Sequence, residues 1–225
     1  MVSPNEELKH VYDIKVVSYL NGKYGWRIIK NRGYGLAEKF WVSGVSKHIG
    51  NDTTGAVDDY TLAIAIYPKY SDSHEWRRFV DAHIWRGNAK YDLDDYSGAI
   101  EDFTRALELI PESDYEFTRI HITRGNAKYR LDNHYGAMDD YTIAIAKAKD
   151  ERMELSSYYN RGLSEYRIGD YLGAVDDLNV YLESVPADAG AYLNRGLSKI
   201  ALGDIDGASS DLGKAAEFGD TDAAQ

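Results

Sequence analysis

Histidines and aspartates are the residues of this chain whose spacing could support chemistry. Two of the six histidines, His83 and His121, stand at equivalent places in a repeated pattern, four residues before a glycine. Two histidines without further ligands nearby are a weak indication of a metal site, and a position that recurs with a repeat usually serves packing. The aspartates also follow the repeat and do not match a calcium-binding loop. We therefore expect no metal and no cofactor.

The sequence also has no phosphate-binding loop and no thiol chemistry. The glycine-rich segment Arg32-Gly33-Tyr34-Gly35 lacks the Lys-Ser/Thr ending of a phosphate-binding loop. The chain has no cysteine, which excludes disulfides and thiolate chemistry. Because no catalytic constellation is present, we predict that the protein is not an enzyme.

A signature recurs along the chain: Arg-Gly, a small residue twelve positions after the glycine, and Asp three positions further on. Numbered in chain order, the first copy is Ser43-Gly44/Ala56/Asp59, which lacks only the arginine. The second to fifth copies are Arg86-Gly87/Ala99/Asp102, Arg124-Gly125/Ala137/Asp140, Arg161-Gly162/Ala174/Asp177 and Arg195-Gly196/Ala208/Asp211. The interior spacing is constant, whereas successive glycines are 43, 38, 37 and 34 residues apart. A hairpin of two helices with a fixed inner turn and variable connections fits this pattern.

The fourth copy shows the helical periodicity most clearly. Tyr159, Gly162 and Tyr166 lie on one stripe, Gly169-Asp170 breaks the helix, and a second stripe begins at Ala174. A glycine inside a helix costs about 1 kcal/mol relative to alanine. We expect each repeat glycine to lie opposite the small residue twelve positions later, where the two helices cross closely.

These segments resemble tetratricopeptide repeats of the Arg-Gly type common in bacteria. Tyr159-Asn160-Arg161-Gly162 together with Asp170-Tyr171-Leu172-Gly173-Ala174 carries the resemblance, which covers residues 36–219. It implies an all-α fold, an α-α superhelix in which the first helix of each repeat lines a concave face where peptides bind. Because solenoid contacts repeat with the unit, we expect each recurrent arginine to pair with an aspartate across helices rather than to bind a ligand.

Candidate ligand-binding residues lie on the first helices, just before and after Arg-Gly and one turn further on. Asparagines there can bond a peptide backbone, an exposed tryptophan can anchor a partner, and arginines favour an acidic segment. The asparagines follow Arg-Gly in the second and third copies and precede it in the fourth and fifth, which interrupts a continuous ladder. The predicted peptide-binding residues are Trp85, Asn88, Arg119, Asn126, Arg130, Asn160, Arg167 and Asn194.

The two ends of the chain do not follow the repeat. Residues 1–35 form an N-terminal extension, in which Asn21-Gly22 between two β-rich segments favours a β-hairpin; a helix over 5–20 is the competing interpretation. Residues 36–225 form the array of five repeats. After the fifth, either small and polar residues cap the array, or the chain is a fragment.

Charge and composition limit the partners. The net charge of −11 and the lack of a basic run argue against nucleic acid, and no apolar stretch predicts a membrane span or a signal peptide. We expect a cytoplasmic protein-interaction scaffold or adaptor that binds a peptide or protein in its concave groove. The alternative is a self-associating assembly domain or a fragment of a larger protein, so a homo-oligomer stays open.

Overall fold

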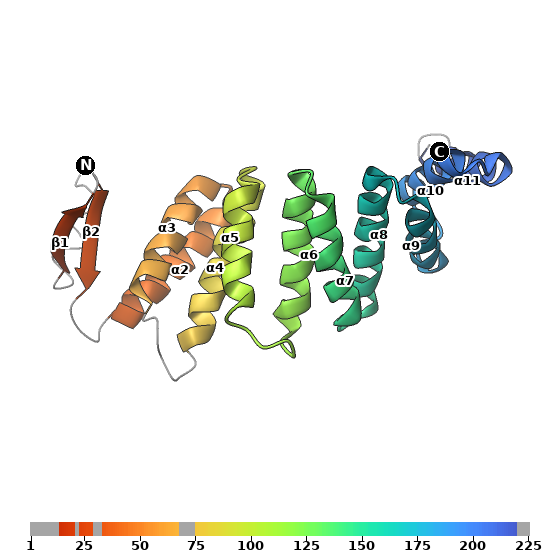
Figure 1. Ribbon diagram of the computed structural model, residues 1–225. Coiled ribbons are helices and arrows are strands. Elements are labelled where there is room, and N and C mark those ends of the chain that lie inside the picture. Colours follow the sequence, from red (N-terminus) through yellow and green to blue (C-terminus); the bar gives the residue numbers. More distant parts are fainter. Residues whose placement is uncertain (1–13, 21–22, 29–32, 68–74, 220–225) are drawn as a thin grey trace. The chain divides into compact units, whose positions relative to one another are not determined.

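The computed structural model describes residues 14–20, 23–28, 33–67 and 75–219. The chain forms two compact units, Met1–Leu93 and Asp94–Gln225, and each is described by itself. The first unit contains strands β1 (Ile14–Leu20) and β2 (Lys23–Ile28) and helices α2 (Gly33–Ile49), α3 (Thr53–Ile66) and α4 (Glu75–Asp92) (Figure 1). The second unit contains α5 (Tyr96–Leu107), α6 (Tyr115–Arg130), α7 (His134–Ala146), α8 (Glu151–Ile168), α9 (Tyr171–Ser184), α10 (Ala189–Leu202) and α11 (Ile205–Gly219).

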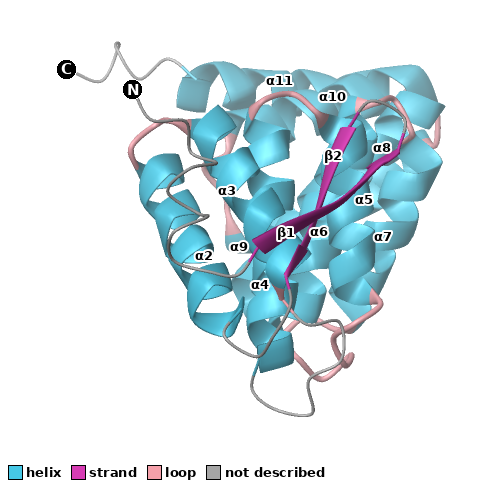
Figure 2. Cartoon of the chain, turned by 90° about the vertical axis from the view of Figure 1, so that its left-hand side faces the viewer, coloured by secondary structure: helices cyan, strands magenta, loops and turns pink. Residues whose placement is uncertain are grey.

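The two strands form the antiparallel pair that is magenta in Figure 2. Ile14 lies opposite Ile28 and Leu20 opposite Lys23, with a register irregularity between Val16 and Ser18. The strands occupy the segments for which the sequence predicts a hairpin, and residues 14–20 are not helical. The Asn21-Gly22 turn itself lies outside the described residues.

The helices pack as antiparallel hairpins in the order of the sequence. In the first unit α2 packs on α3 and α3 on α4; in the second, each helix from α5 to α11 packs on the next. The repeated small residue of the second helix is buried in every copy, at Ala56, Ala99, Ala137, Ala174 and Ala208. The all-α repeat architecture expected from the sequence is therefore present.

Every turn that enters a second helix has the same local geometry. One residue in the left-handed region, with φ between 57° and 84°, comes first: Asn51, Asp94, Asp132, Gly169 or Gly203. The next residue is Asp or Asn, whose side chain accepts a hydrogen bond from the backbone N–H of a glycine three positions later, as Asp170 does from Gly173 at 3.1 Å. The cap satisfies one of the free N–H groups of the helix start, so these residues fix where each second helix begins.

The repeat glycines make room for a large side chain of the second helix. A Cβ added to Gly125 would lie 2.7 Å from the ring of Tyr141, and one added to Gly44 would lie 2.7 Å from the ring of Tyr60. At Gly162 the nearest atom would be Cγ of Leu178 at 3.2 Å. The expected approach to the small residue twelve positions later is present at Gly162, where the backbone carbonyl oxygen of Ala174 would lie 3.5 Å from the added Cβ. The expectation missed the side chain that fills the space, which lies sixteen positions after the glycine, one turn further along the second helix.

The recurrent arginine pairs with the aspartate of its own repeat in the three copies that lie within the second unit. Arg124 donates from Nε and Nη2 to Asp140 at 3.0 and 2.6 Å, and Arg195 donates to Asp211 at 2.8 and 2.6 Å. Arg161 and Asp177 are joined in the same two-pronged way, at 2.7 and 2.8 Å. This confirms the predicted structural pairing.

The third arginine nitrogen, Nη1, reaches the second helix of the preceding repeat. Arg124 donates to Thr104 at 3.1 Å, Arg161 to Thr142 at 3.2 Å, and Arg195 to Asn179 at 2.7 Å. One guanidinium thus joins three helices. In the first unit Arg86 makes the equivalent bond to Thr61 at 3.1 Å.

A lysine three positions after the glycine supports the same aspartate. Lys128 lies 2.7 Å from Asp140, and Lys199 lies 2.8 Å from Asp211. In the first copy, where serine replaces arginine, Ser43 donates to Asp59 at 2.6 Å and Lys47 lies 2.7 Å away. Burial raises the pKa of Asp140, but hydrogen bonds from His121, Arg124 and Lys128 outweigh it and hold that pKa well below its usual range.

Glycine-to-alanine variants should separate the packing role of the repeat glycine from its helix propensity. Gly125→Ala should lower the free energy of unfolding by about 1–3 kcal/mol, because the ring of Tyr141 is fully buried and cannot move aside. Gly162→Ala should lose less, since its neighbour is 3.2 Å away. Gly213→Ala, with nothing within 4 Å, should gain up to about 1 kcal/mol. Urea denaturation measures all three, and a Gly125→Ala protein as stable as Gly213→Ala would contradict this assignment.

Removal of a bridging arginine should be costly. Arg124→Met leaves the buried Asp140 without its two-pronged partner, and we expect a loss of about 3 kcal/mol in chemical denaturation. The control is Arg119→Met, which removes an exposed arginine bonded to Glu116 of its own helix and should cost less than about 0.5 kcal/mol. Because the pKa of Asp140 is lowered by folding, its contribution to stability is complete at neutral pH and is lost as the pH falls below about 4. Equal losses in the two variants would show that the bridge does not hold the repeats.

Candidate functional site

The first helices of neighbouring repeats meet at a pair of asparagines. Asn126 on α6 accepts two hydrogen bonds at its Oδ1 atom, from the hydroxyl of Tyr141 at 2.8 Å and from Nδ2 of Asn160 on α8 at 3.2 Å. Both carboxamides are only partly buried. These bonds leave the Asn126 side-chain nitrogen, which has two N–H donors, and the Asn160 side-chain oxygen, an acceptor, for an added chain.

One predicted arginine joins this pair of helices. Arg167 on α8 donates from Nε to the hydroxyl of Tyr129 on α6 at 3.2 Å. Arg167 is exposed, and the hydrogen-bond partner of its guanidinium is a hydroxyl and not a carboxylate. Asn126 and Asn160 are therefore the predicted residues that the structure brings into contact, and Arg167 links the same two helices through Tyr129.

Two other predicted arginines have acidic neighbours. Arg119 is bonded to Glu116 of its own helix at 2.8 Å. Arg130 lies 3.7 Å from Asp94 and stacks over the ring of Tyr96 at 4.8 Å. Their charges are partly compensated within the second unit, and neither contacts the asparagine pair directly.

The remaining predicted residues are held by their own surroundings. Trp85 on α4 is partly buried; it packs on the cluster of Ala56 and Tyr60 and meets the ring of His48 edge-on, 6.2 Å between centroids. Asn194 on α10 donates to the backbone carbonyl of Gly190 at 2.7 Å. Asn88 on α4 is partly buried. Trp85 thus contributes to packing within the first unit.

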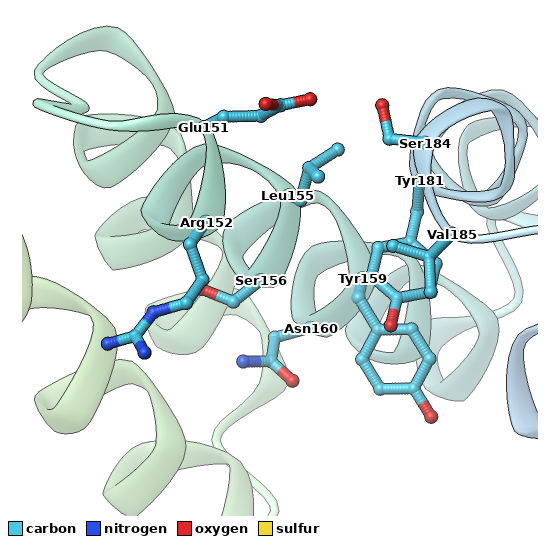
Figure 3. A pocket seen from close by; sticks show the side chains of 9 residues that line it. All are labelled: Glu151, Arg152, Leu155, Ser156, Tyr159, Asn160, Tyr181, Ser184 and Val185. Atoms are coloured by element: carbon cyan, nitrogen blue, oxygen red, sulfur yellow. The ribbon is translucent and has the colours of Figure 1, made fainter. Parts of the chain in front are cut away.

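A shallow pocket of about 420 Å³ lies between α8 and α9, next to the asparagine pair (Figure 3). It is lined by Glu151, Arg152, Leu155, Ser156, Tyr159, Asn160, Tyr181, Ser184 and Val185. Asn160 belongs both to this pocket and to the bond with Asn126. A ligand that reached the Asn160 carbonyl oxygen would therefore lie at the mouth of the pocket.

Two tyrosines form the aromatic wall of the pocket. The rings of Tyr159 and Tyr181 are 4.9 Å apart and tilted by 47°. The Tyr181 hydroxyl donates to Asp188 at 2.9 Å. Burial, followed by this hydrogen bond, raises the pKa of Tyr181 to about 12. The tyrosines thus stay neutral and present an apolar surface near Leu155 and Val185.

The sequence did not single out this pocket. Tyr159, Tyr181 and Val185 lie on the apolar stripes of two helices, and such stripes predict packing. No pattern in the sequence distinguishes these residues from packing residues, because the pocket depends on how α8 and α9 cross.

The histidines serve packing and electrostatics. His121 is buried; its Nδ1 atom lies 2.8 Å from Asp140 and its ring meets Phe117 at 4.7 Å. His83 meets Phe79 in the same way at 4.8 Å. Within the residues that the structure describes, no three histidine, aspartate or glutamate side chains gather in a way that could hold a metal ion.

No helix in the described part of the chain has both the length and the apolar character needed to cross a membrane.

The described chain is a helical-repeat protein, and comparisons with known proteins identify the repeat. Residues 80–113 match the family model described as tetratricopeptide repeat. The repeated helical hairpins on either side have the same signature and turn, and this helical-repeat architecture fits a tetratricopeptide-repeat protein. No curated protein matches it.

Solved structures share the fold at low sequence identity. A crystal structure of MamA is 22% identical in sequence and has a TM-score of 0.68; the match covers 81% of this chain and 97% of the MamA chain. BtubC (BKLC) from P. vanneervenii is 17% identical, with 83% and 81% covered and a TM-score of 0.68. YrrB, described as a TPR protein with an unusual peptide-binding site, is 15% identical, with 84% and 92% covered and a TM-score of 0.66.

Proposed function

We propose that this protein is an interaction scaffold that binds a peptide or protein partner along its first helices, with the main contacts on α6 and α8. The observation that carries the proposal is Asn160, which joins the asparagine pair to the pocket between α8 and α9. The side-chain oxygen of Asn160 can accept a hydrogen bond from a peptide N–H group, and the pocket can hold an apolar side chain of the same peptide. The role is binding and not catalysis.

The predicted site residues divide into a centre and a periphery under this proposal. Asn126, Asn160 and Arg167 form the centre, and Arg152 at the pocket adds a second exposed guanidinium. Within the described residues neither guanidinium forms an ion pair with a carboxylate, which supports the proposal that the bound segment is acidic. Arg119, Arg130, Asn194, Asn88 and Trp85 are peripheral, because each is engaged by or packed within its own surroundings.

Three broader expectations stay proposals. Residues 36–225 form an array of five helix-turn-helix repeats and residues 1–35 a separate extension, which is supported by the same turn geometry at Asn51, Asp94, Asp132, Gly169 and Gly203. The partner is a polypeptide and neither nucleic acid nor membrane, in line with the net charge of −11. A cytoplasmic location is consistent with a chain that uses no cysteine.

The test is a screen of a random-peptide library against wild-type protein, followed by affinity measurements on variants. The double variant Asn126→Ala/Asn160→Ala should weaken the selected peptides by at least about tenfold, since two backbone hydrogen bonds of roughly 1 kcal/mol each are removed. The matched control is Asp139→Ala/Asp176→Ala, which changes exposed side chains on the second helices of the same two repeats. Selected peptides that bind the asparagine variant as tightly as wild type would place the site elsewhere.

Self-association is the second candidate, and exposed apolar residues on α10 favour it. Leu193 and Ile200 are 44% and 45% exposed, whereas the equivalent Tyr159 and Tyr166 of α8 are partly buried. If this face joins a second copy, the mass measured by light scattering should rise with concentration, and Leu193→Ser/Ile200→Ser should return it to that of a monomer. A concentration-independent monomer would argue against this candidate and leave the scaffold proposal untouched.

A further inference from the structure

The fourth repeat reverses the charge of one position in the arginine–aspartate arrangement. Three residues after the repeat glycine the chain has Lys47, Lys90, Lys128 and Lys199, but Glu165 in the fourth copy. Where the structure shows lysine beside the aspartate, as at Lys128 and Lys199, two cations surround one carboxylate. In the fourth repeat one cation, Arg161, is left between two carboxyl groups.

Both carboxyl groups lie against the same nitrogen atom. Nε of Arg161 is 2.7 Å from Oδ2 of Asp177 and 3.7 Å from Oε1 of Glu165. The other two nitrogens of this guanidinium are used by Asp177 and Thr142. Asp177 therefore receives the direct hydrogen bonds, and Glu165 receives only the weaker attraction at longer range.

Glu165 is enclosed and one of its oxygens has no partner. Its side chain belongs to a residue that is 7% exposed, and Oε2 is buried without a hydrogen bond. A Cβ added to Gly173 would lie 3.0 Å from the Glu165 carboxyl carbon, so the carboxyl group is pressed against the first turn of α9. A buried, unpaired carboxylate is costly, and protonation removes that cost.

The helices around α8 supply no further cation. Asp177 and Asp170 of the α9 hairpin act on Glu165 with the same negative sign, and Arg161 alone opposes them. On the side of α7, Arg161 meets the uncharged Thr142. Lys128 of α6 and Lys199 of α10 are bound to Asp140 and Asp211 of their own repeats, and Arg167 is bonded to Tyr129.

We propose that Glu165 and Asp177 form a buried proton-binding site that holds α8 against α9 when a proton is bound and loosens this contact when the proton leaves. In the protonated form, Glu165 can donate a hydrogen bond to the carboxylate of Asp177, and the pair carries one negative charge opposite one arginine. When the proton leaves, two negative charges share that arginine in a buried place. The proposal concerns the packing of the fourth repeat and does not depend on what the protein binds.

The direction of the pH dependence follows from the two states of the chain. Burial, followed by the charge of Asp177, raises the pKa of Glu165 to about 7, from an ordinary value of 4.5. The folded chain therefore holds this proton at pH values where the unfolded chain has released it. Stability from this site is complete below pH 4.5 and is lost as the pH rises through about 7.

The test compares wild type with Glu165→Gln, which keeps the shape and cannot titrate. Thermal midpoints are measured from pH 5 to pH 8.5, and the difference between the two proteins cancels the other titrating groups. The midpoint of wild type should fall relative to the variant by roughly 5 °C as the pH rises across this range. Glu165→Lys, which restores the residue of the other repeats, should behave like Glu165→Gln. A constant difference between wild type and Glu165→Gln would overturn the proposal.

A second measurement uses the wild-type protein alone, in case a variant fails to fold. Carbon NMR of side-chain carboxyl groups, with glutamate labelled, should show one signal that titrates with a midpoint near 7, far above the ordinary 4.5. Amide hydrogen exchange, corrected for intrinsic pH dependence, should become faster in α8 and α9 above that midpoint and stay unchanged in α6 and α7. A Glu165 carboxyl that titrates near its ordinary value would contradict the proposal.

Discussion

The structure of the second unit depends on a guanidinium group whose three nitrogens connect the arginine's own helix to two others. In each of its three complete repeats the arginine takes both oxygens of an aspartate sixteen residues later and a threonine or asparagine of the preceding repeat. The aspartate is almost fully buried, so it cannot be left without this partner. The arginine therefore sets the crossing of the two helices in a repeat and the spacing to the repeat before it.

This bridge explains why the interior of the repeat has a constant length. Arginine and aspartate face each other only if the turn between the helices always has the same number of residues and the same path. The left-handed residue, the Asp or Asn cap and the glycine at the third helical position supply that path in every copy. Connections between repeats carry no such constraint, because the bond from Nη1 to the preceding repeat tolerates different loop lengths. The variable glycine spacing in the sequence is the consequence.

Much of the fold could be predicted because the bridge and the turn repeat identically. The repeat signature, the pairing of arginine with aspartate and the strand segments around Asn21-Gly22 were all accessible from residue types and spacing. The reason for the repeat glycine was not, since its neighbour is Tyr60, Tyr141 or Leu178 and these residues share a position but not a chemical type. A search for recurring small residues found the alanine instead and missed the large side chain one turn further on.

The candidate site was only partly accessible for a related reason. Asn126 follows its Arg-Gly, whereas Asn160 precedes its own. From the sequence, this change of position interrupts the row of asparagines along the first helices. In the structure α6 and α8 are in contact, and Nδ2 of Asn160 lies 3.2 Å from Oδ1 of Asn126. This pairing depends on how neighbouring repeats pack, which the spacing within one repeat does not contain.

The fourth repeat shows how a regular scaffold can hold an exception. With Glu165 in place of lysine, the buried Asp177 has a second carboxyl group beside it and no lysine. The bonds from Arg161 to Asp177 and the cap of α9 by Asp170 are nevertheless formed. The bridge therefore tolerates loss of the lysine, and the remaining imbalance is one negative charge, which a single proton removes. The helices α8 and α9 carry both Glu165 and the pocket that Asn160 lines. The repeat with the unusual buried charge is therefore also the repeat with the candidate binding surface. Residues that recur maintain the array, and those that break the pattern in α8 and α9 distinguish one repeat from its neighbours.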